Sequence, residues 1–218
     1  MPRSKQNRKV KGVPEATILR LPLYLNRLRA LQRAGAEQVS SRELADGLQI
    51  KAGQLRHDLH HFGGFSRPGH PYEVDALILR LIEVMKLGHC PYIIAGVGQL
   101  GQAIANYTHF DEYGFRLKGL FDVNPRIQGM LVRDIPVRGL LEMDSFIRKE
   151  KIEMGVLAVP PSAAQDVVDR MVKAGIRGIW NFAPVELETS PDVVVQEEFL
   201  SVSLMALNFK MKSISSGS

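Results

Sequence analysis

Three glycines near the middle of the chain have the spacing of a phosphate-binding turn. Gly96, Gly98 and Gly101 follow a short apolar run and precede residues compatible with a helix, 102–106. In such a turn the first glycine permits the tight bend, the second lets backbone amides approach a pyrophosphate, and the third lets the helix pack closely on the strand. The amino terminus of the helix then faces the negative charge, so the motif predicts a dinucleotide site.

An acidic residue lies where such a site needs a ribose acceptor. A second apolar run, residues 117–121, ends at Asp122, which is 21 residues after Gly101. A carboxylate there accepts hydrogen bonds from the ribose of NAD and repels the 2′-phosphate of NADP. Arg126 lies close enough in sequence to leave NADP open. An empty Rossmann-like scaffold is the remaining alternative.

No catalytic triad stands out in this half of the chain. Tyr107, Asn181 and Glu186 have the side chains of an acid, an orienter and a base in a dehydrogenase, but nothing in their spacing requires those roles. A dehydrogenase also usually needs a separate substrate domain. We therefore expect no enzyme activity, with an NAD-dependent oxidoreductase as the alternative.

The two halves of the 218-residue chain differ in charge. Up to Gly88 there are 15 Lys and Arg against 8 Asp and Glu, and the remainder has 13 against 15. Residues 1–13 are basic and almost without apolar side chains, which predicts a disordered tail. A basic part joined to a slightly acidic part indicates that the first part meets a polyanion.

The basic half has the pattern of a helix-turn-helix. Apolar residues at helical spacing predict a first helix before Gly35, and Ser40 with Glu43 predicts a capping box ahead of a short second helix. A third helix over 52–62 has a polar face that includes Arg56, whose guanidinium can pair bidentately with guanine. The residues expected to contact DNA are Ser40, Ser41, Lys51, Gln54, Arg56, His57, His60, Arg67 and His70.

The alternation of elements predicts an α/β fold. Residues 65–72 have the turn residues of a wing, and a helix over 74–87 would complete a winged-helix DNA-binding domain. Strand, turn and helix patterns then alternate as in a Rossmann parallel sheet, with further strands over 155–159 and 178–182. The expected parts are a disordered basic tail (1–13), a winged-helix domain (14–88), a Rossmann dinucleotide-binding domain (89–200) and a carboxy-terminal helix and tail (201–218).

Composition disfavours several classes of protein. No apolar run approaches the ~20 residues of a membrane helix, and the start has no apolar stretch of a signal peptide, so we expect a cytoplasmic protein. The single cysteine, Cys90, cannot form an internal disulfide. His57, His60 and His61 have no carboxylate or cysteine at metal-ligand spacing, so we expect no metal site.

Several short segments match one family of regulators. They are PEATILRLPLYL at 14–25, VSSRELA at 39–45, LRHDL at 55–59 with FG at 62–63, GVGQLG at 96–101 with ANY at 105–107, FDVNP at 121–125, AVP at 158–160 and AGIRGIWNFAP at 174–184. From about residue 13 to about residue 209 the chain resembles the Rex family of NADH-responsive transcriptional repressors. The resemblance implies a homodimer that exchanges a carboxy-terminal helix, here about 201–211, and a double-stranded DNA operator with two-fold symmetry.

The resemblance also implies NAD(H) as the cofactor and suggests which residues bind it. The pyrophosphate would lie at the glycine motif, formed by Gly96, Val97, Gly98, Gln99, Leu100 and Gly101. The adenosine side would take Asp122 and Val123, and the nicotinamide half would lie near Val159, Pro160, Asn181 and Phe182, with Tyr107 also assigned to the cofactor site. The second domain resembles, in addition, the CoA-binding domain of succinyl-CoA synthetases, so a CoA-type ligand is an alternative that Asp122 disfavours.

The chain departs from the family pattern in three places. The wing residues 66–71 displace the basic residue and add two prolines, and His57 replaces the usual lysine, which would make DNA affinity more sensitive to pH near neutrality. In the family an arginine of the first helix pairs with an aspartate near the exchanged helix when DNA is bound, and a tyrosine takes that aspartate when NADH arrives. The matching positions hold Asn26, Phe199 and Tyr107, so the tyrosine alone remains.

The sequence thus predicts a transcriptional regulator, by resemblance a repressor, that couples the NADH/NAD⁺ ratio to operator binding. The switch positions predict that NADH binds but releases DNA less sharply than in typical members, or that another ligand controls the protein. A DNA-binding protein whose Rossmann domain serves dimerisation is a further alternative.

Overall fold

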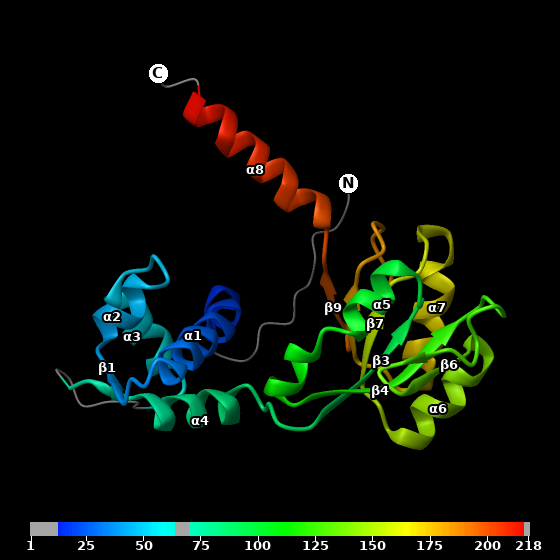
Figure 1. The fold of residues 1–218 in the computed structure, drawn as a ribbon, viewed down its shortest axis with the longest axis horizontal. Helices are drawn as coiled ribbons and strands as arrows, with labels where there is room; N and C mark the ends of the chain where they lie inside the picture. The colour runs from blue at the N-terminus through cyan, green and yellow to red at the C-terminus, as the bar shows by residue number, and fades with distance from the viewer. Residues whose placement is uncertain (1–12, 64–69, 216–218) are drawn as a thin grey trace. The chain divides into compact units, whose positions relative to one another are not determined.

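The structure, a computed structural model, describes residues 13–63 and 70–215. The chain divides into two compact units, Met1–Gly88 and His89–Ser218 (Figure 1). Residues 1–12 of the expected tail lie outside the described residues, as does the expected wing up to residue 69, including Arg67.

The first unit consists of helices and a two-stranded ribbon. In chain order these are α1 Glu15–Arg33, β1 Gln38–Val39, α2 Ser41–Asp46, α3 Ala52–His60, β2 Tyr72–Glu73 and α4 Val74–Val84. Leu21, Leu25 and Leu28 repeat at helical spacing and form the buried face of α1. The strands β1 and β2 pair antiparallel, with Val39 opposite Tyr72. No pattern in the sequence predicts this ribbon, because two residues are too few to show an alternation.

The second unit is built on a sheet of seven described strands. They are β3 Cys90–Ala95, β4 Phe115–Asp122, β5 Leu131–Val132, β6 Ile135–Gly139, β7 Met154–Leu157, β8 Gly178–Asn181 and β9 Val194–Glu197. Their spatial order is β5-β6-β4-β3-β7-β8-β9, and every neighbouring pair is parallel except β5 with β6. From β6 to β9 this is the doubly wound order of dinucleotide-binding folds. The strand order reverses between β3 and β7, and such folds bind ligands at the carboxyl ends of the strands at that point.

Helices cover both faces of this sheet (Figure 1). They are α5 Gln99–Ala105, the 3₁₀ segments η1 Thr108–Tyr113 and η2 Leu140–Glu142, α6 Met143–Glu150 and α7 Pro161–Ala174. Ile93 and Ala95 of β3 belong to the core shared with α6 and α7, whereas Tyr92 and Ile94 belong to the core shared with α5. Successive β3 side chains therefore point to opposite faces, as in a strand buried on both sides. The predicted α/β fold class is confirmed.

The expected strands over 155–159 and 178–182 are present but end earlier, at Leu157 and Asn181. The elements that no sequence pattern predicts are the β5–β6 hairpin, α6 and β9. Each of these three is short, with at most eight residues in any one helix or strand. Short elements have too few residues to establish a hydrophobic period.

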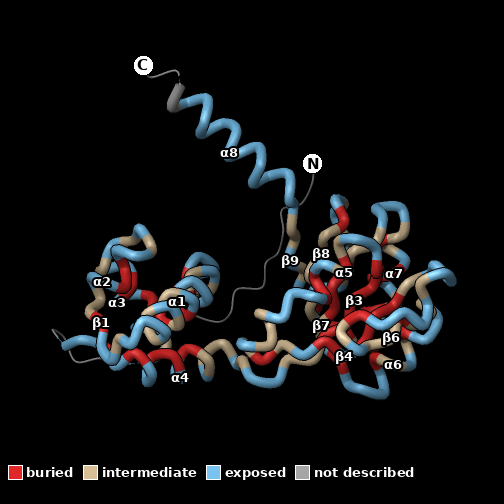
Figure 2. Tube along the Cα trace, viewed as in Figure 1, coloured by how far each residue is buried: buried red, intermediate tan, exposed pale blue. Residues whose placement is uncertain are grey.

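The chain continues into α8, Leu200–Ser215. Every side chain from residue 199 to residue 213 is exposed, in contrast to the buried strands of the sheet (Figure 2). No helix in the described part of the chain is both long and apolar enough to cross a membrane.

Candidate DNA-binding and dinucleotide-binding sites

Helix α3 has one buried face and one exposed polar face. Its buried side chains are Leu55, Asp58 and Leu59. Its exposed side chains, together with that of the preceding N-cap residue, are those of Lys51, Gln54, Arg56, His57 and His60. The structure therefore places five of the expected DNA-contacting residues on the exposed side of a single helix. His70 is also exposed, whereas Arg67 lies outside the described residues.

The predicted capping box at the start of α2 is confirmed. The Glu43 amide donates to Ser40 Oγ at 3.1 Å, and the Ser40 amide donates to Glu43 Oε2 at 2.8 Å. The hydrogen bond from the Ser40 amide, and next the Ser40 side chain, lower the pKa of the Glu43 carboxyl. Ser41, the first residue of α2, accepts a hydrogen bond at 3.0 Å from Arg56 Nη1. The Ser41 hydroxyl thus orients the Arg56 guanidinium, which we expect to contact DNA.

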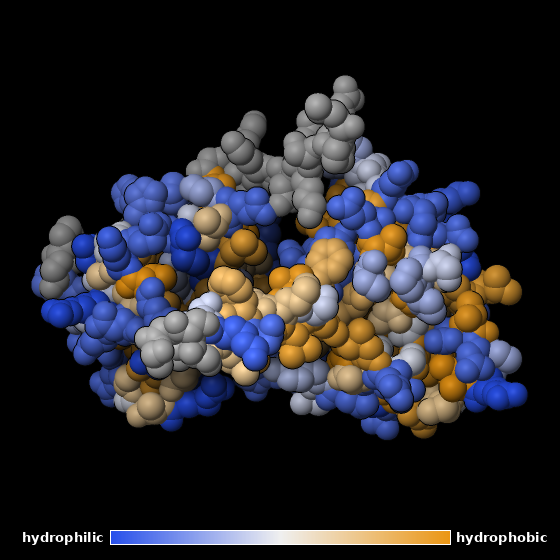
Figure 3. Space-filling model, turned by 90° about the horizontal axis from the view of Figure 1, so that it is seen from above, coloured by the Kyte–Doolittle hydropathy of each residue, from blue (hydrophilic) through white to orange (hydrophobic). Residues whose placement is uncertain are grey.

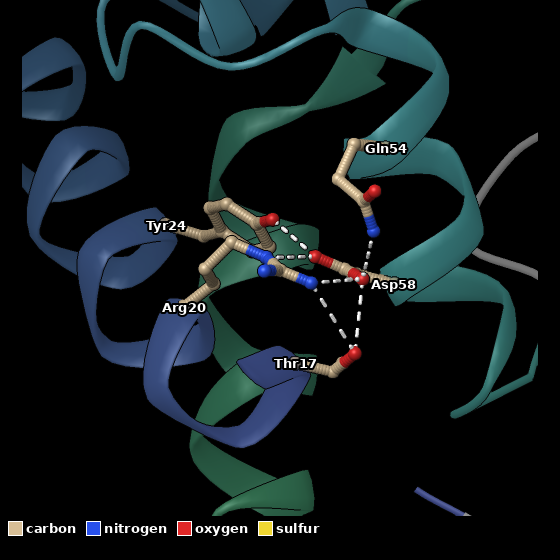
Figure 4. Close-up of polar contacts among 5 residues, drawn as sticks. All are labelled: Thr17, Arg20, Tyr24, Gln54 and Asp58. Carbon is tan, nitrogen blue, oxygen red and sulfur yellow. Dashed lines mark hydrogen bonds and ion pairs between the residues drawn. The ribbon is translucent and has the colours of Figure 1, made fainter. Parts of the chain in front are cut away.

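A buried carboxylate joins α3 to α1 (Figure 4). Asp58 is fully buried and accepts two hydrogen bonds from Arg20, Nε to Oδ2 at 2.6 Å and Nη2 to Oδ1 at 2.8 Å. The Tyr24 hydroxyl donates to Oδ2 at 2.5 Å and the Thr17 hydroxyl to Oδ1 at 3.0 Å. A fifth hydrogen bond, at 2.8 Å, comes from Gln54 Nε2. We call these five residues the Asp58 cluster.

The Asp58 cluster keeps its carboxylate ionised. Burial by itself would raise the pKa of Asp58, but the hydrogen bonds from Arg20, Tyr24, Gln54 and Thr17 outweigh it and hold the pKa well below the usual range. Burial and the hydrogen bond to Asp58 raise the pKa of Tyr24, and the hydrogen bond to Asp58 raises that of Arg20. At neutral pH a neutral phenol, a guanidinium and a carboxylate therefore fix the orientation of α3 on α1.

Sequence reasoning missed this cluster, although a signal was present. Asp58 lies between Leu55 and Leu59 on the apolar side of α3, where an aspartate needs a partner. Thr17, Arg20 and Tyr24 are three and four residues apart and so share one side of α1. A buried acid and a row of donors on a neighbouring helix indicate a buried ion pair.

The glycine turn has the geometry that its sequence predicts. Gly96 has a φ of +90°, and a Cβ there would lie 2.4 Å from the carbonyl oxygen of Ala158, so the turn packs against the chain that follows β7. A Cβ on Gly101 would lie 1.9 Å from the Gly96 carbonyl oxygen, which shows how closely α5 approaches the turn. Gly98 is exposed, and a Cβ there would meet open space. That open space lies where a pyrophosphate would bind.

Asp122 is joined to the turn directly. Its Oδ2 accepts from the Val97 amide at 2.7 Å, and its Oδ1 accepts from the Asn124 amide at 2.8 Å. The Gly96 amide donates to the Phe121 carbonyl at 2.8 Å, so the ends of β3 and β4 are held together. Each carboxylate oxygen has a second lone pair, and Asp122 is therefore positioned by the turn and still able to accept ribose hydroxyls. Gln99 is exposed and Leu100 half-buried at the start of α5.

Exposed apolar side chains flank Asp122. Val123 follows β4 and is 73% exposed, and Leu141 follows β6 and is 87% exposed. Asp122 pairs with Gly139 across β4 and β6, so both side chains lie just beyond the carboxyl ends of adjacent strands. The family resemblance places Val123 on the adenosine side, whereas no motif in the sequence marks Leu141.

The residues expected near the nicotinamide half lie in three settings. Val159 is half-buried and Pro160 is exposed at the N-cap of α7. Asn181 is buried, and its Nδ2 donates to the Val185 carbonyl at 3.0 Å and to Glu197 Oε2 at 2.7 Å. Both of its N–H groups are thus used inside the protein, so the Asn181 amide has none to donate to a ligand. The Phe182 ring contacts the Trp180 ring at a tilt of 56°, with 4.5 Å between ring centroids.

Tyr107 belongs to a row of aromatic rings that ends at Phe182. Its ring centroid lies 4.7 Å from that of Phe110, which lies 5.8 Å from Trp180. Tyr107 is 52% exposed, so its hydroxyl-bearing ring is the solvent end of this row. The hydrogen bonds described for the chain include none between Tyr107, Asn181 and Glu186, and both N–H groups of Asn181 are donated to other residues. Among the described residues no three His, Cys, Asp or Glu side chains are grouped as metal ligands.

The structure describes all three positions of the family's switch, Asn26, Tyr107 and Phe199. Asn26 is exposed on α1, and Phe199, directly before α8, is 37% exposed. Arg27, next to Asn26, packs its guanidinium against α2: a Cβ on Gly47 would lie 2.4 Å from Arg27 Nε. The side chain of Arg27 is therefore held against Gly47.

Two family models match the chain, one in each unit. Residues 12–60 match a model described as a putative DNA-binding protein N-terminus. Residues 90–185 match a model described as a CoA binding domain.

Proteins of similar length match nearly the whole chain. Redox-sensing transcriptional repressor Rex of Thermoanaerobacter sp. (strain X514) is 42% identical over 200 residues, which cover 91% of this chain and 89% of that protein. The protein of the same name from Clostridioides difficile (strain 630) is 42% identical over 204 residues, covering 93% and 97%.

Solved structures are similar to the chain over residues of both units. A crystal structure of RSP, a repressor in complex with β-NAD⁺ and operator DNA, has a TM-score of 0.87 and 41% identity and covers 93% of this chain and 94% of its own. RSP in complex with β-NADH has a TM-score of 0.86 and 39% identity, covering 93% and 96%.

Proposed function

The chain belongs to the Rex family of redox-sensing transcriptional repressors, and we propose that it binds operator DNA with its first unit and NAD(H) with its second, coupling the NADH/NAD⁺ ratio to transcription. The observation that carries this proposal is the presence in one chain of a helix, α3, that exposes Arg56 and His57 on its polar face and of a Rossmann turn whose Val97 amide donates to Asp122. RSP, similar over 93% of the chain, binds β-NAD⁺ together with operator DNA.

We propose that α3 enters the major groove of the operator. The exposed side chains of α3 include a guanidinium, an amide and imidazoles, groups that can contact base edges and phosphates. The Asp58 cluster fixes α3 on α1, and Ser41 holds Arg56, so the contacting face is organised before DNA arrives. Ser40, Ser41 and Lys51 at the starts of the two helices would contact phosphates, and His70, with Arg67, would act from the wing.

In the second unit, we propose that the pyrophosphate of the dinucleotide lies over Gly98. The adenosine would lie between Asp122 and the apolar pair Val123 and Leu141. A carboxylate already bonded to the Val97 amide would accept the ribose hydroxyls, which favours NAD(H) over NADP(H) and over a CoA-type ligand with its 3′-phosphate. The nicotinamide half would lie toward Val159, Pro160 and Phe182, with Asn181 shaping the loop that follows β8 rather than donating to the ligand.

The partner that α8 needs is a second copy of the chain. Taking 100° per residue, the apolar side chains of α8 form two opposite stripes: Leu200, Leu204, Leu207 and Met211 on one, and Val202, Met205 and Phe209 on the other. All seven are more than half exposed in the single chain, and apolar side chains lie open elsewhere on its surface (Figure 3). A helix that is apolar on two opposite sides needs burial on both. We propose that two chains exchange α8, giving a homodimer that matches an operator with two-fold symmetry.

We propose a regulator without enzyme activity, acting in the cytoplasm where the operator lies. Asn181, which a dehydrogenase would use as orienter, has both N–H groups committed within the protein. Turnover of an alcohol or a hydroxy acid with NAD⁺ would favour an oxidoreductase instead.

The test is DNA binding by the full-length chain to a genomic fragment library, with NAD⁺ or NADH present, together with calorimetry of NADH binding. We expect selective retention of operator-containing fragments and NADH binding without turnover. If the chain binds DNA but no nucleotide, the Rossmann unit would serve dimerisation instead. If the chain binds no DNA, the proposal is contradicted.

A further inference from the structure

Gln54 is the point at which the Asp58 cluster reaches the exposed face of α3. The two residues are one helical turn apart, Gln54 exposed and Asp58 fully buried. Gln54 Nε2 donates to Asp58 Oδ1 at 2.8 Å, and Figure 4 shows the amide nitrogen turned toward the carboxylate and the amide oxygen turned away. The same side chain thus belongs to the interior hydrogen-bond network and to the surface proposed to meet DNA.

The charge on Asp58 determines which way the Gln54 amide points. An ionised carboxylate only accepts hydrogen bonds, so an amide oxygen facing it would bring two acceptors together. The carboxylate itself is held by donors from α1, two from Arg20 and one each from Tyr24 and Thr17. Reversing the Gln54 amide would lose a charge-assisted hydrogen bond that nothing else in the cluster replaces. Gln54 Oε1 therefore points outward as an acceptor.

Resting on the proposed role of α3, we infer that Gln54 reads adenine in the major groove and that Asp58 is the positioning residue that sets its amide for this task. An amide pairs with adenine by accepting from N6 and donating to N7. One N–H of Gln54 goes to Asp58, which leaves Oε1 and the second N–H for the base. Guanine and thymine present acceptors, O6 with N7 and O4, and would leave the outward Oε1 without a donor.

The place of Gln54 in the helix suits this reading. It is the third residue of α3, and the amino-terminal residues of a recognition helix contact base edges. Gly53 before it is exposed and has no side chain, so the start of the helix is open to close approach. Arg56, held by Ser41, lies two residues further on and suits guanine. The helix would thus read two kinds of base with two prepositioned side chains.

The experiment compares the bases that full-length variants select from a pool of random duplexes in the presence of NAD⁺. We expect the wild type to select adenine at one position of each half-site and Gln54→Ala to lose that preference alone. Binding of the selected duplex should fall roughly tenfold, with NADH binding unchanged. Lys51→Ala is the matched control: it should weaken all duplexes alike and keep the adenine preference, since a lysine at the N-cap contacts phosphate.

Asp58→Asn tests the positioning role. Asparagine donates as well as accepts, so the Gln54 amide is free to reverse, and the adenine preference should relax while the position read by Arg56 keeps its base. An unchanged adenine preference in a folded Asp58→Asn would overturn the positioning role, and Gln54→Ala tests separately whether Gln54 reads adenine. Equal base preferences for the wild type and Gln54→Ala would overturn the inference and leave the DNA-binding function intact. Failure of the wild type to enrich any duplex would overturn both.

Discussion

Asp58 occupies a position where the apolar spacing of α3 would suit a leucine. Desolvation of a lone carboxylate costs several kcal/mol, and removing one partner of a buried pair typically costs about 3–5 kcal/mol. Here five donated hydrogen bonds, two of them from one guanidinium, offset that cost. A well-packed apolar replacement would be about as stable. What the cluster adds is a defined orientation of α3 on α1, because hydrogen bonds are directional and apolar contacts are not.

The Asp58 cluster predicts a pH dependence of folding. Because the pKa of Asp58 is lower in the folded chain than in the unfolded one, its stabilisation is fully present above the unfolded pKa, near 4, and is lost as the pH falls below it. We expect Asp58→Asn to lower the free energy of unfolding of the first unit by about 3–5 kcal/mol at pH 7 and to flatten its dependence on pH below about 5.

Two probes separate the units in this measurement. Urea unfolding followed by far-UV circular dichroism reports the helices of both units, whereas fluorescence of Trp180, the single tryptophan, reports the second unit. The circular dichroism transition should move and the fluorescence transition should stay. If the free energy of unfolding of Asp58→Asn fell with acid as steeply as that of the wild type, groups other than Asp58 would control the pH dependence.

The glycines of the turn differ in what a side chain would meet, and this gives a matched pair of variants. Gly98→Ala should fold as well as the wild type, because a Cβ there meets open space in the free chain, but should weaken NADH binding, because the proposed pyrophosphate occupies that space. Gly98→Asp should fold but lose NADH binding by at least tenfold in calorimetry, since it brings negative charge to the place of the pyrophosphate. Operator binding by the first unit should persist in both. Retained NADH affinity in Gly98→Asp would place the pyrophosphate elsewhere.

The geometry of the glycine turn was predictable because backbone chemistry restricts the choice of residues there. The three glycines and Asp122 have few substitutes, and their spacing is local. Asn181 and Leu141 were different: a buried amide satisfied by the Val185 carbonyl and Glu197, and an exposed leucine beyond β6, depend on contacts between distant segments. Their sequence surroundings carry no trace of those contacts.

At the scale of elements, the sequence was informative for long helices and for strands next to glycine turns. Helices α1, α4 and α7 have a full apolar period, β3 is a short apolar run that ends at the glycine turn, and the apolar end of β4 stops at Asp122. The β5–β6 hairpin turns through Arg133 and Asp134, both at positive φ, rather than through the glycine or asparagine that would have marked it. That choice of turn residues left the hairpin without a sequence signal.

Helix α8 carries a prediction that tests each stripe separately. Leu204→Asp and Met205→Asp place a charge on one stripe each, about 100° apart around the helix, so each should shift the chain from dimer to monomer if both stripes are buried in the assembly. Sedimentation equilibrium measures the shift. Asn208→Asp, which lies between the stripes, is the control and should leave the dimer intact. A dimer unaffected by Met205→Asp would mean that α8 packs through the Leu204 side alone.

At the scale of the whole molecule, the two units must communicate for a nucleotide to control DNA binding. A ligand shifts an equilibrium between two states by its differential affinity for them, and moving it from 1:99 to 99:1 requires about a 10⁴-fold difference. The resemblance to the Rex family places part of that difference in an arginine–aspartate pair that a tyrosine breaks. In this chain the corresponding positions are Asn26 and Phe199, and an amide with a phenyl ring cannot form an ion pair.

The neighbouring arginine does not repair this loss. Arg27 lies about 100° from Asn26 around α1, and its guanidinium is packed against Gly47 of the same unit. Tyr107 is exposed, but the carboxylate that it would capture is absent at Phe199. Neither end state of the switch is therefore held by the contacts that the family uses.

We expect NADH to bind this chain but to release operator DNA over a broader range of NADH concentration, and less completely, than a sharp two-state switch would. The measurement is DNA binding titrated with NADH at fixed NAD⁺. The double variant Asn26→Arg with Phe199→Asp supplies the missing pair and should sharpen the release, because the ion pair stabilises the DNA-binding state and gives Tyr107 a carboxylate to capture. Each single variant introduces one unpaired charge and should not. Complete release from the wild type at low NADH would show that other residues carry the coupling.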